Sequence, residues 1–332
     1  MKKYFKFNWL LDIIIINIII AYAFFIVFQF DHEVADIQYI PENMPKLAEE
    51  NVIKVMTYNI AHGRGYLSMY DKSSFGRNFN IKSKKEVFYR LDKISDLVKA
   101  EDIDILILEE VDFSASWSYH IDEAMHIAKK AGFNNVVKGI KWSVDLPFLK
   151  IRSGNAILSK YNLMWAQNKK FESESIWWRL VGGHSYLSGL YLIGNKPIKI
   201  IASHFDSDSA IAREQEATEI VEAVAESNYP VILAGDFNSV TSETKKENKK
   251  MRKKYLDNTI EIIIESNLFD IDMDKLEPNR KFTYSAENPH RLIDYIFATP
   301  KLRINEYYVV KEKLSDHFPL VARISLNNLE KD

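Results

Sequence analysis

The chain has 332 residues, of which 47% are hydrophobic and 27% are charged, and its formal net charge is -2. A chain of this length and apolar content can bury one large core or two modest ones, and its small net charge gives no overall attraction to nucleic acid or anionic lipid. The chain has no cysteine, which excludes disulfides, thiolate zinc sites, cysteine nucleophiles and lipid attachment through cysteine.

The first patterned segment, residues 9–30, is almost wholly apolar. As a helix it would extend about 33 Å, which is long enough to cross the hydrocarbon core of a membrane. Lysines lie before it in residues 1–8, and acidic residues follow it in residues 31–36. The positive-inside rule therefore predicts a short cytoplasmic N-terminus at 1–8, a transmembrane signal-anchor helix at 9–30 in the cell membrane, and an extracytoplasmic domain. A cleaved signal peptide is the alternative.

Residues 31–50 are polar and contain two prolines, which is typical of a tether, and a single domain is expected over 51–332. In that domain, apolar residues at helical spacing predict a helix over 84–100, and the apolar run that follows predicts a buried strand at 103–108. Strands are also expected at 155–158, 186–193, 198–203 and 231–234, and the strands at 186–193 and 198–203 are expected to form a hairpin around Gly194-Asn195. Helices are expected at 121–131 and 210–226, and closing segments at 259–266, 291–298, 307–310 and 320–324. Mixed strands with interleaved helices indicate a layered α/β sandwich.

Polar side chains stand at or just beyond the ends of several apolar runs. Asn59 and Glu110 each end one, Asp236 ends a third, and His317 follows a fourth by a few residues. Strands that end in carboxylates, amides and imidazoles bring these groups to one rim of a sheet, where they can hold hard cations and phosphates. The pattern therefore predicts a metal-assisted phosphoester hydrolase.

Five segments resemble the endonuclease/exonuclease/phosphatase superfamily, also called the DNase I-like fold. They are Met56-Thr57-Tyr58-Asn59, Leu108-Glu109-Glu110-Val111, Ala202-Ser203-His204-Phe205, Gly235-Asp236-Phe237-Asn238 together with Ile293-Asp294-Tyr295, and Ser315-Asp316-His317. They occur in the order typical of the family and cover residues 52–326. The resemblance implies a four-layer α/β/β/α sandwich with its active site at one rim, here preceded by the predicted transmembrane helix. It also implies hydrolysis of a phosphoester with Mg²⁺ or Mn²⁺.

The same resemblance implies the metal ligands. Glu110 is expected to be the principal ligand, Asn59 a direct or second-shell ligand beside it, and Asp316 a further carboxylate on the metal side. Glu109 stands where the family usually has glutamine. Because side chains alternate along a strand, only one of the two adjacent acids can face a metal.

The resemblance also implies the groups that act on the phosphate. Asp236 is the candidate general base and Asn238 a phosphate ligand, and their spacing puts both on one side of an extended segment. Asp294 lies in an apolar segment, where a carboxylate needs a partner, and the resemblance supplies His317. An imidazole held protonated by a carboxylate can donate to a phosphate oxygen in the transition state. His204 is expected to be a second phosphate-binding imidazole.

Substrate-binding candidates come from two other places in the chain. Arg152 and Asn155 resemble a family segment near the site, and Trp178 and Arg179 lie in a loop rich in aromatic residues. Such side chains can stack bases or sit among lipid headgroups, and ordinary packing of a large loop is an equal alternative. The basic run at 245–254 can attract a polyanion, although a solvated helix face is the commoner outcome.

Together these features predict a membrane-anchored, divalent-metal-dependent hydrolase of a phosphodiester, with nucleic acid slightly favoured. A phospholipid hydrolase acting on phosphoinositide or sphingomyelin-type substrates is the enzymatic alternative, because a membrane anchor suits it. A catalytically inactive binding or scaffold domain is the non-enzymatic alternative, and it should have lost Glu110, Asp236 or His317. The predicted partners are the phosphoester substrate and the membrane, with no obligate protein partner evident.

Overall fold

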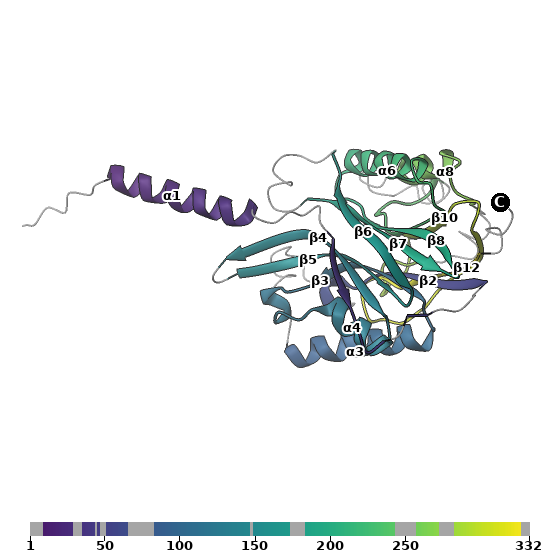
Figure 1. Ribbon diagram of the computed structural model, residues 1–332. Coiled ribbons are helices and arrows are strands. Elements are labelled where there is room, and N and C mark those ends of the chain that lie inside the picture. Colours follow the sequence, from purple (N-terminus) through teal and green to yellow (C-terminus); the bar gives the residue numbers. More distant parts are fainter. Residues whose placement is uncertain are drawn as a thin grey trace, which may run out of the picture.

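In the computed structural model, the described residues are 9–28, 35–43, 45–46, 51–65, 83–146, 149–172, 183–242, 257–271 and 282–326. Two mixed β-sheets pack face to face, and helices cover the outer face of each sheet (Figure 1). This arrangement confirms the α/β sandwich expected from the sequence.

The first sheet has seven strands in the order β1-β4-β5-β3-β2-β12-β11. Their bounds are β1 Asp36–Tyr39, β2 Val52–Asn59, β3 Ile105–Asp112, β4 Asn135–Leu146, β5 Leu149–Ser159, β11 Arg303–Val309 and β12 Leu320–Ser325. The central pair, β2 and β3, is parallel, and its register places Asn59 opposite Glu109. The polar ends of these two strands therefore meet at the same edge of the sheet.

The second sheet has five strands in the order β10-β9-β8-β7-β6. Their bounds are β6 Asn162–Lys170, β7 Ser185–Ile193, β8 Lys196–His204, β9 Val231–Asp236 and β10 Asp294–Ala298. Strands β7 and β8 form the predicted hairpin. Its two turn residues, Gly194 and Asn195, have positive φ angles of 55° and 63°, as a tight hairpin turn with the twist of the strands requires.

Four helices form the outer layers. Helices α3 (Lys84–Ala100) and α4 (Glu123–Ala131) cover the first sheet, and α6 (Ala210–Ala225) and α8 (Thr259–Glu265) cover the second (Figure 1). The bounds of α3 coincide with its apolar periodicity, because Ser83 accepts a hydrogen bond from the amide of Glu86 and so caps the first turn. Two short 3-10 helices, η1 (Ala61–Gly63) and η3 (Ser116–Ser118), follow β2 and β3.

The side chains buried between the sheets change from apolar to polar along β2. Alternate residues of β2 point toward the second sheet, and of these Ile53 and Val55 belong to the apolar core between the sheets. Thr57 and Asn59 continue the same row and are also buried. The apolar core therefore gives way to buried polar groups at the end of β2.

The segment expected to be a tether differs from that expectation. Residues 36–39 form β1, which pairs with Asn135–Lys138 of β4 at the edge of the first sheet. The hydrogen bonds of an edge strand fix these residues onto the domain, although their polar composition resembles a linker. The folded unit therefore begins before residue 51.

Helix α1 (Trp9–Phe28) lies where the sequence predicts a transmembrane segment. Among the residues that the structure describes, no helix combines the length and the apolarity needed to span a membrane. The assignment of a transmembrane helix to residues 9–30 is therefore not supported.

The location of the domain stays a prediction, based on the lysines of residues 1–8. A reporter that is active only outside the cytoplasm, fused after Asp332, should be active if the prediction holds. An inactive reporter on an intact, full-length fusion would contradict it. A shortened product in the medium would instead identify a cleaved signal.

Candidate active site

Three neighbouring strands of the second sheet bring polar side chains into one row. The register places His204 at the end of β8 beside Asp236 at the end of β9, and Asp236 opposite Asp294 at the start of β10. All three residues are buried. The row lies at the end of the sheets where Asn59 ends β2, since Asn59 donates a hydrogen bond to Asp236.

A glycine sets the spacing of the first two members of this row. Gly235 has a φ angle of +152°, and a Cβ atom added to it would lie 1.8 Å from the carbonyl oxygen of Ser203 on β8. No side chain fits at this distance. The close approach of β8 and β9 here holds His204 beside Asp236.

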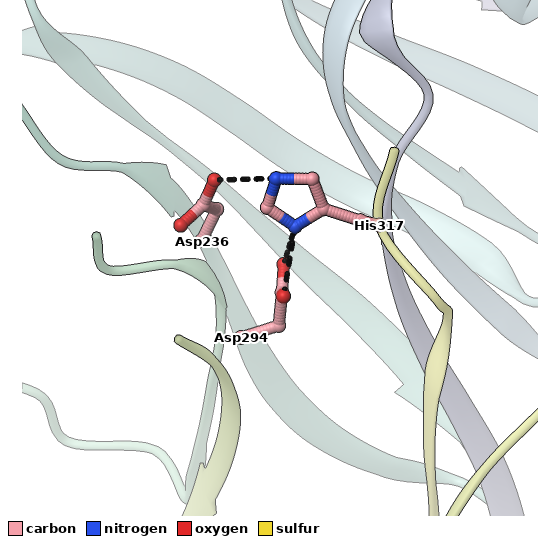
Figure 2. A group of neighbouring side chains, drawn as sticks. All are labelled: Asp236, Asp294 and His317. Carbon is pink, nitrogen blue, oxygen red and sulfur yellow. Dashed lines mark hydrogen bonds and ion pairs between the residues drawn. The ribbon is translucent and has the colours of Figure 1, made fainter. Parts of the chain in front are cut away.

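The imidazole of His317 lies between two carboxylates (Figure 2). Its Nδ1 atom is 2.9 Å from Oδ2 of Asp294 and 3.2 Å from Oδ1, and its Nε2 atom is 3.7 Å from Oδ2 of Asp236. Asp294 and His317 thus form the predicted pair, and the pair adjoins the candidate general base.

Neighbouring charges and burial shift the pKa of the His317 imidazole in opposite directions. Burial alone would lower the pKa of His317, but the negative charges of Asp294 and Asp236 and the hydrogen bond to Asp294 raise this pKa well above its usual value. Burial, followed by the charge of Asp294, raises the pKa of Asp236 to about 7. The arrangement therefore keeps a proton on the imidazole at neutral pH and lets Asp236 accept one near neutrality.

His204 has the opposite electrostatic environment. Its Nε2 atom lies 3.6 Å from Oδ2 of Asp236. Burial, and then the positive charge of Lys141, lower the pKa of His204 well below the usual value. His204 is therefore a neutral imidazole that can exchange hydrogen bonds without carrying charge.

Asn59 connects the two sheets at the site. Its Nδ2 atom donates to Oδ2 of Asp236 at 3.1 Å, and its Oδ1 atom accepts from the backbone amide of Ala61 at 3.0 Å. The backbone carbonyl of Asn59 accepts from the hydroxyl of Ser315 at 2.7 Å. Because both ends of the amide are engaged, this geometry suits an orienting role better than direct ligation of a metal.

Asn238 does not lie on an extended segment as its spacing suggested. Strand β9 ends at Asp236, and Asn238 has a left-handed backbone with a φ angle of +49°. Its backbone amide donates to Oδ1 of Asp236 at 2.9 Å, and its Nδ2 atom donates to the carbonyl of Phe205 at 3.0 Å. The turn keeps Asn238 next to Asp236 through hydrogen bonds rather than through strand alternation.

The two adjacent glutamates separate because β3 bulges. The register between β3 and β5 shifts between Leu108 and Val111, and Glu110 has a left-handed φ angle of +51°. The side chain of Glu110 is 35% exposed. Glu109 is fully buried, and its Oε1 atom accepts from the hydroxyl of Thr57 at 2.8 Å. Glu110 therefore reaches the rim, whereas Glu109 lies inside.

The pKa values of the two glutamates diverge accordingly. Burial and then the charge of Asp294 raise the pKa of Glu109 well above its usual value, so this carboxyl carries a proton. Burial also raises the pKa of Glu110, but the positive charges of His62 and His317 outweigh it, and the net shift is downward. A protonated Glu109 presents a neutral group where the family usually has glutamine, and Glu110 stays ionised.

The residues on the rim suit a divalent metal. Ionised Glu110 is an oxygen donor of the kind that Mg²⁺ and Mn²⁺ prefer. Burial raises the pKa of Asp316, the charge of His317 opposes this shift, and the charge of Glu110 adds to it. A cation held by both carboxylates would offset this unfavourable interaction of like charges.

A second group also offers ligand atoms that converge. Atoms of Asp236, Asp294 and His317 lie within 4.8 Å of one another. However, Nδ1 of His317 is already engaged with Asp294, and a metal there would replace the hydrogen bonds of the pair. The rim carboxylates Glu110 and Asp316 therefore fit the metal better.

Of the four residues predicted to bind substrate, the structure describes two. The backbone carbonyl of half-buried Arg152 accepts from the amide of Phe113 at 2.7 Å, which anchors the loop after β3. Asn155 is buried, and among the described residues its Oδ1 atom has no hydrogen-bond partner. Trp178 and Arg179 lie outside the described residues, as does the basic run at 245–254.

Sequence reasoning missed three polar residues near the site. Thr57 holds Glu109, and it lies two residues before Asn59 on the same face of β2, a spacing that could have identified it. His62 and Asp112 form a pair with 2.8 Å between Nδ1 and Oδ1. The only sequence signal for His62 is its place three residues after Asn59.

Comparisons with known proteins bear on the family and the fold of this chain. Residues 56–317 match the model of the Endonuclease/Exonuclease/phosphatase family. A search of curated proteins finds no match. Similar solved structures include an endonuclease/exonuclease/phosphatase from Beutenbergia cavernae, with 19% identity, 83% of this chain and 72% of that chain covered, and a TM-score of 0.61.

Two further structures of this fold are a phosphatase and a complex with DNA. One is the mannosyl-6-phosphatase Bt3783 of Bacteroides thetaiotaomicron, with 15% identity, 82% of this chain and 99% of that chain covered, and a TM-score of 0.55. The other is D. rerio TDP2 complexed with a single-strand DNA product, with 12% identity, 83% and 100% covered, and a TM-score of 0.54. At these identities the likeness is one of fold.

The His317 pair generates a prediction about protonation. In the Asp294→Asn variant the imidazole loses its main source of positive pKa shift, so its pKa should fall below the wild-type value. A pKa that is higher in the folded state than in the unfolded state stabilises the fold at low pH, and this stabilisation is lost as the pH rises through the folded-state pKa. Because the pKa of His317 is lower in the variant, the variant should lose less stability as the pH rises. The His317 Cε1–H resonance, followed by NMR from pH 5 to 9, measures the first effect. An unchanged titration midpoint in a folded variant would contradict the pairing.

Proposed function

The chain belongs to the endonuclease/exonuclease/phosphatase family, and we propose that it is a divalent-metal-dependent hydrolase of phosphoester bonds. The observation that carries the proposal is the position of His317 between Asp294 and Asp236, at the rim where Glu110 stays ionised. Such a site combines a proton donor, a proton acceptor and a metal-binding carboxylate. Groups of these three kinds accelerate the in-line attack of water on a phosphorus atom.

Each group then has a separate task. Asp236, with a pKa of about 7, accepts a proton from the attacking water. His317 donates through Nε2 to a phosphate oxygen as negative charge develops there. Neutral His204 and the amide of Asn238 contact the same phosphate. Mg²⁺ or Mn²⁺, when bound, supplies positive charge to the phosphate oxygens.

Glu110 and Asp316 would hold that metal, and Asn59 orients the site around it. Asn59 is fixed by Ala61 and Ser315, so it can hold Asp236 in place while the substrate changes shape. This preorganisation reduces the rearrangement needed at the moment of reaction.

The proposed substrate is a phosphodiester, with nucleic acid slightly ahead of phospholipid. A DNA complex among the proteins of this fold supports the first choice, and the mannosyl-6-phosphatase leaves phosphomonoesters as a second. An inactive scaffold is disfavoured, because Glu110, Asp236 and His317 are all present and lie in a connected arrangement.

A substrate panel tests the proposed function. The purified chain should hydrolyse at least one of plasmid DNA, RNA, phosphoinositides, sphingomyelin and bis-nitrophenyl phosphate in the presence of Mg²⁺ or Mn²⁺. Treatment with EDTA should abolish this hydrolysis, and the added metal should restore it. Full activity after exhaustive chelation would refute the metal dependence, and a folded, metal-loaded protein inactive on phosphodiesters and phosphomonoesters alike would refute the reaction.

The bulge in β3 predicts unequal effects of two matched substitutions. Glu110→Gln removes the ionised carboxylate at the rim and should reduce kcat by about 10²–10³, as expected for the loss of a major electrostatic contact. Glu109→Gln replaces a protonated carboxyl group with an amide of similar shape and should change kcat only a few-fold. Steady-state kinetics on the same substrate compare the two. The reverse ranking would show that Glu109 faces the metal.

A further inference from the structure

The turn after β2 has an unusual backbone at two residues that are not glycine. Ala61 has a φ angle of 47°, and His62 has a φ angle of 53° with a ψ angle of 36°. Left-handed conformations are uncommon for such residues and persist where the surrounding structure imposes them. Here Asn59 accepts a hydrogen bond from the amide of Ala61 and holds the turn. The turn therefore determines where the side chain of His62 lies.

The imidazole of His62 contacts two acidic residues of β3. Its Nδ1 atom lies 2.8 Å from Oδ1 of Asp112, and its Nε2 atom lies 3.6 Å from Oε2 of Glu110. Asp112 is fully buried, and its other oxygen accepts from Nε1 of Trp117 at 2.7 Å. Asp112 is thus fixed from both sides and can fix the imidazole in turn.

This arrangement parallels that of His317. In both cases a buried aspartate engages Nδ1, and Nε2 points to a carboxylate of the site, at 3.7 Å for Asp236 and 3.6 Å for Glu110. The aspartate of the His317 pair begins β10 in the second sheet, whereas the aspartate of the His62 pair ends β3 in the first sheet. Glu110 itself lies in a bulge, so the strand ladder does not fix its side chain.

We propose that His62 is a positioning residue for Glu110, and that Asp112 holds His62 in the orientation that this task needs. The inference rests on the proposed function, which assigns Glu110 to the metal. Partners of metal ligands fix the direction of the ligand, and their loss typically weakens metal affinity about 10- to 100-fold. In this chain the left-handed turn places the imidazole where it can restrain the partly exposed carboxylate of Glu110 on a bulged strand.

A purely structural role for His62 makes a different prediction. If the turn alone required this residue, asparagine or glycine would serve at least as well, because both adopt the left-handed conformation more readily than histidine. The variants His62→Asn and His62→Gly therefore separate the two roles. They should still fold, with a Tm lowered by the loss of the hydrogen bond to buried Asp112, and they should also lose metal affinity.

The experiment measures Mn²⁺ binding to the full chain by electron paramagnetic resonance, with Tm from thermal unfolding. We expect the Kd for Mn²⁺ to rise about 10- to 100-fold in His62→Asn and His62→Gly. His126→Asn is the matched control, since Nε2 of His126 lies 2.9 Å from Asp92 in a partly exposed pair between α3 and α4. The control should leave the Kd unchanged.

Glu110→Gln distinguishes the two ways in which the inference can fail. If Glu110→Gln weakens Mn²⁺ binding and both His62 variants bind like the wild type, the positioning role is refuted and the metal assignment stands. If Glu110→Gln itself binds Mn²⁺ like the wild type, the assignment of Glu110 to the metal fails, and the role of His62 fails with it.

Discussion

The site depends on one hydrogen bond between the two sheets, from the Asn59 amide to the Asp236 carboxylate. Apolar packing brings the sheets together, but it does not fix their relative position to the accuracy that chemistry requires. A buried amide and a buried carboxylate each demand a partner, so an offset of the sheets would leave both unsatisfied. This demand links β2 to β9 and, through Asp236, to His317 and Asp294. The polar end of the sandwich therefore fixes the relative position of the sheets at the site more closely than apolar packing alone would.

The same polar end of the sandwich contains more buried acidic groups than basic ones. Asp236, Asp294 and Glu109 all lie in the gap between the sheets and act on one another electrostatically. The fold tolerates them because Glu109 takes up a proton and His317 carries a positive charge. Such groups titrate as a set, and the proton affinity of each reflects the state of the others. The chemistry of Asp236 is thus a property of the whole cluster.

Much of this architecture could be predicted from local sequence. Helix α3 was predicted correctly because its cap and its apolar spacing agree, and the β7–β8 hairpin because Gly194 and Asn195 suit a left-handed turn. The apolar strand around Asp294 indicated that this carboxylate needs a partner, and the family resemblance supplied His317 as that partner.

Other features depend on contacts that no local pattern reveals. The bulge at Glu110 arises from pairing between β3 and β5, and β1 owes its strand to β4, about a hundred residues away. The pair of His62 and Asp112 joins positions 50 residues apart. The transmembrane prediction was based on the length and apolarity of residues 9–30 and on the charges that flank them, and among the described residues no helix meets the requirements for spanning a membrane.

Gly235 has a consequence for how this protein can change over time. Any side chain at this position would push β9 away from the Ser203 carbonyl and so draw Asp236 away from His204. An added Cβ atom at Gly235 would therefore disturb the sheet and the site at once. At most positions of an enzyme, selection for folding and selection for activity can be told apart by variants that lose one and keep the other. At Gly235 the two coincide, so a lineage that abandoned catalysis would still be expected to retain this glycine.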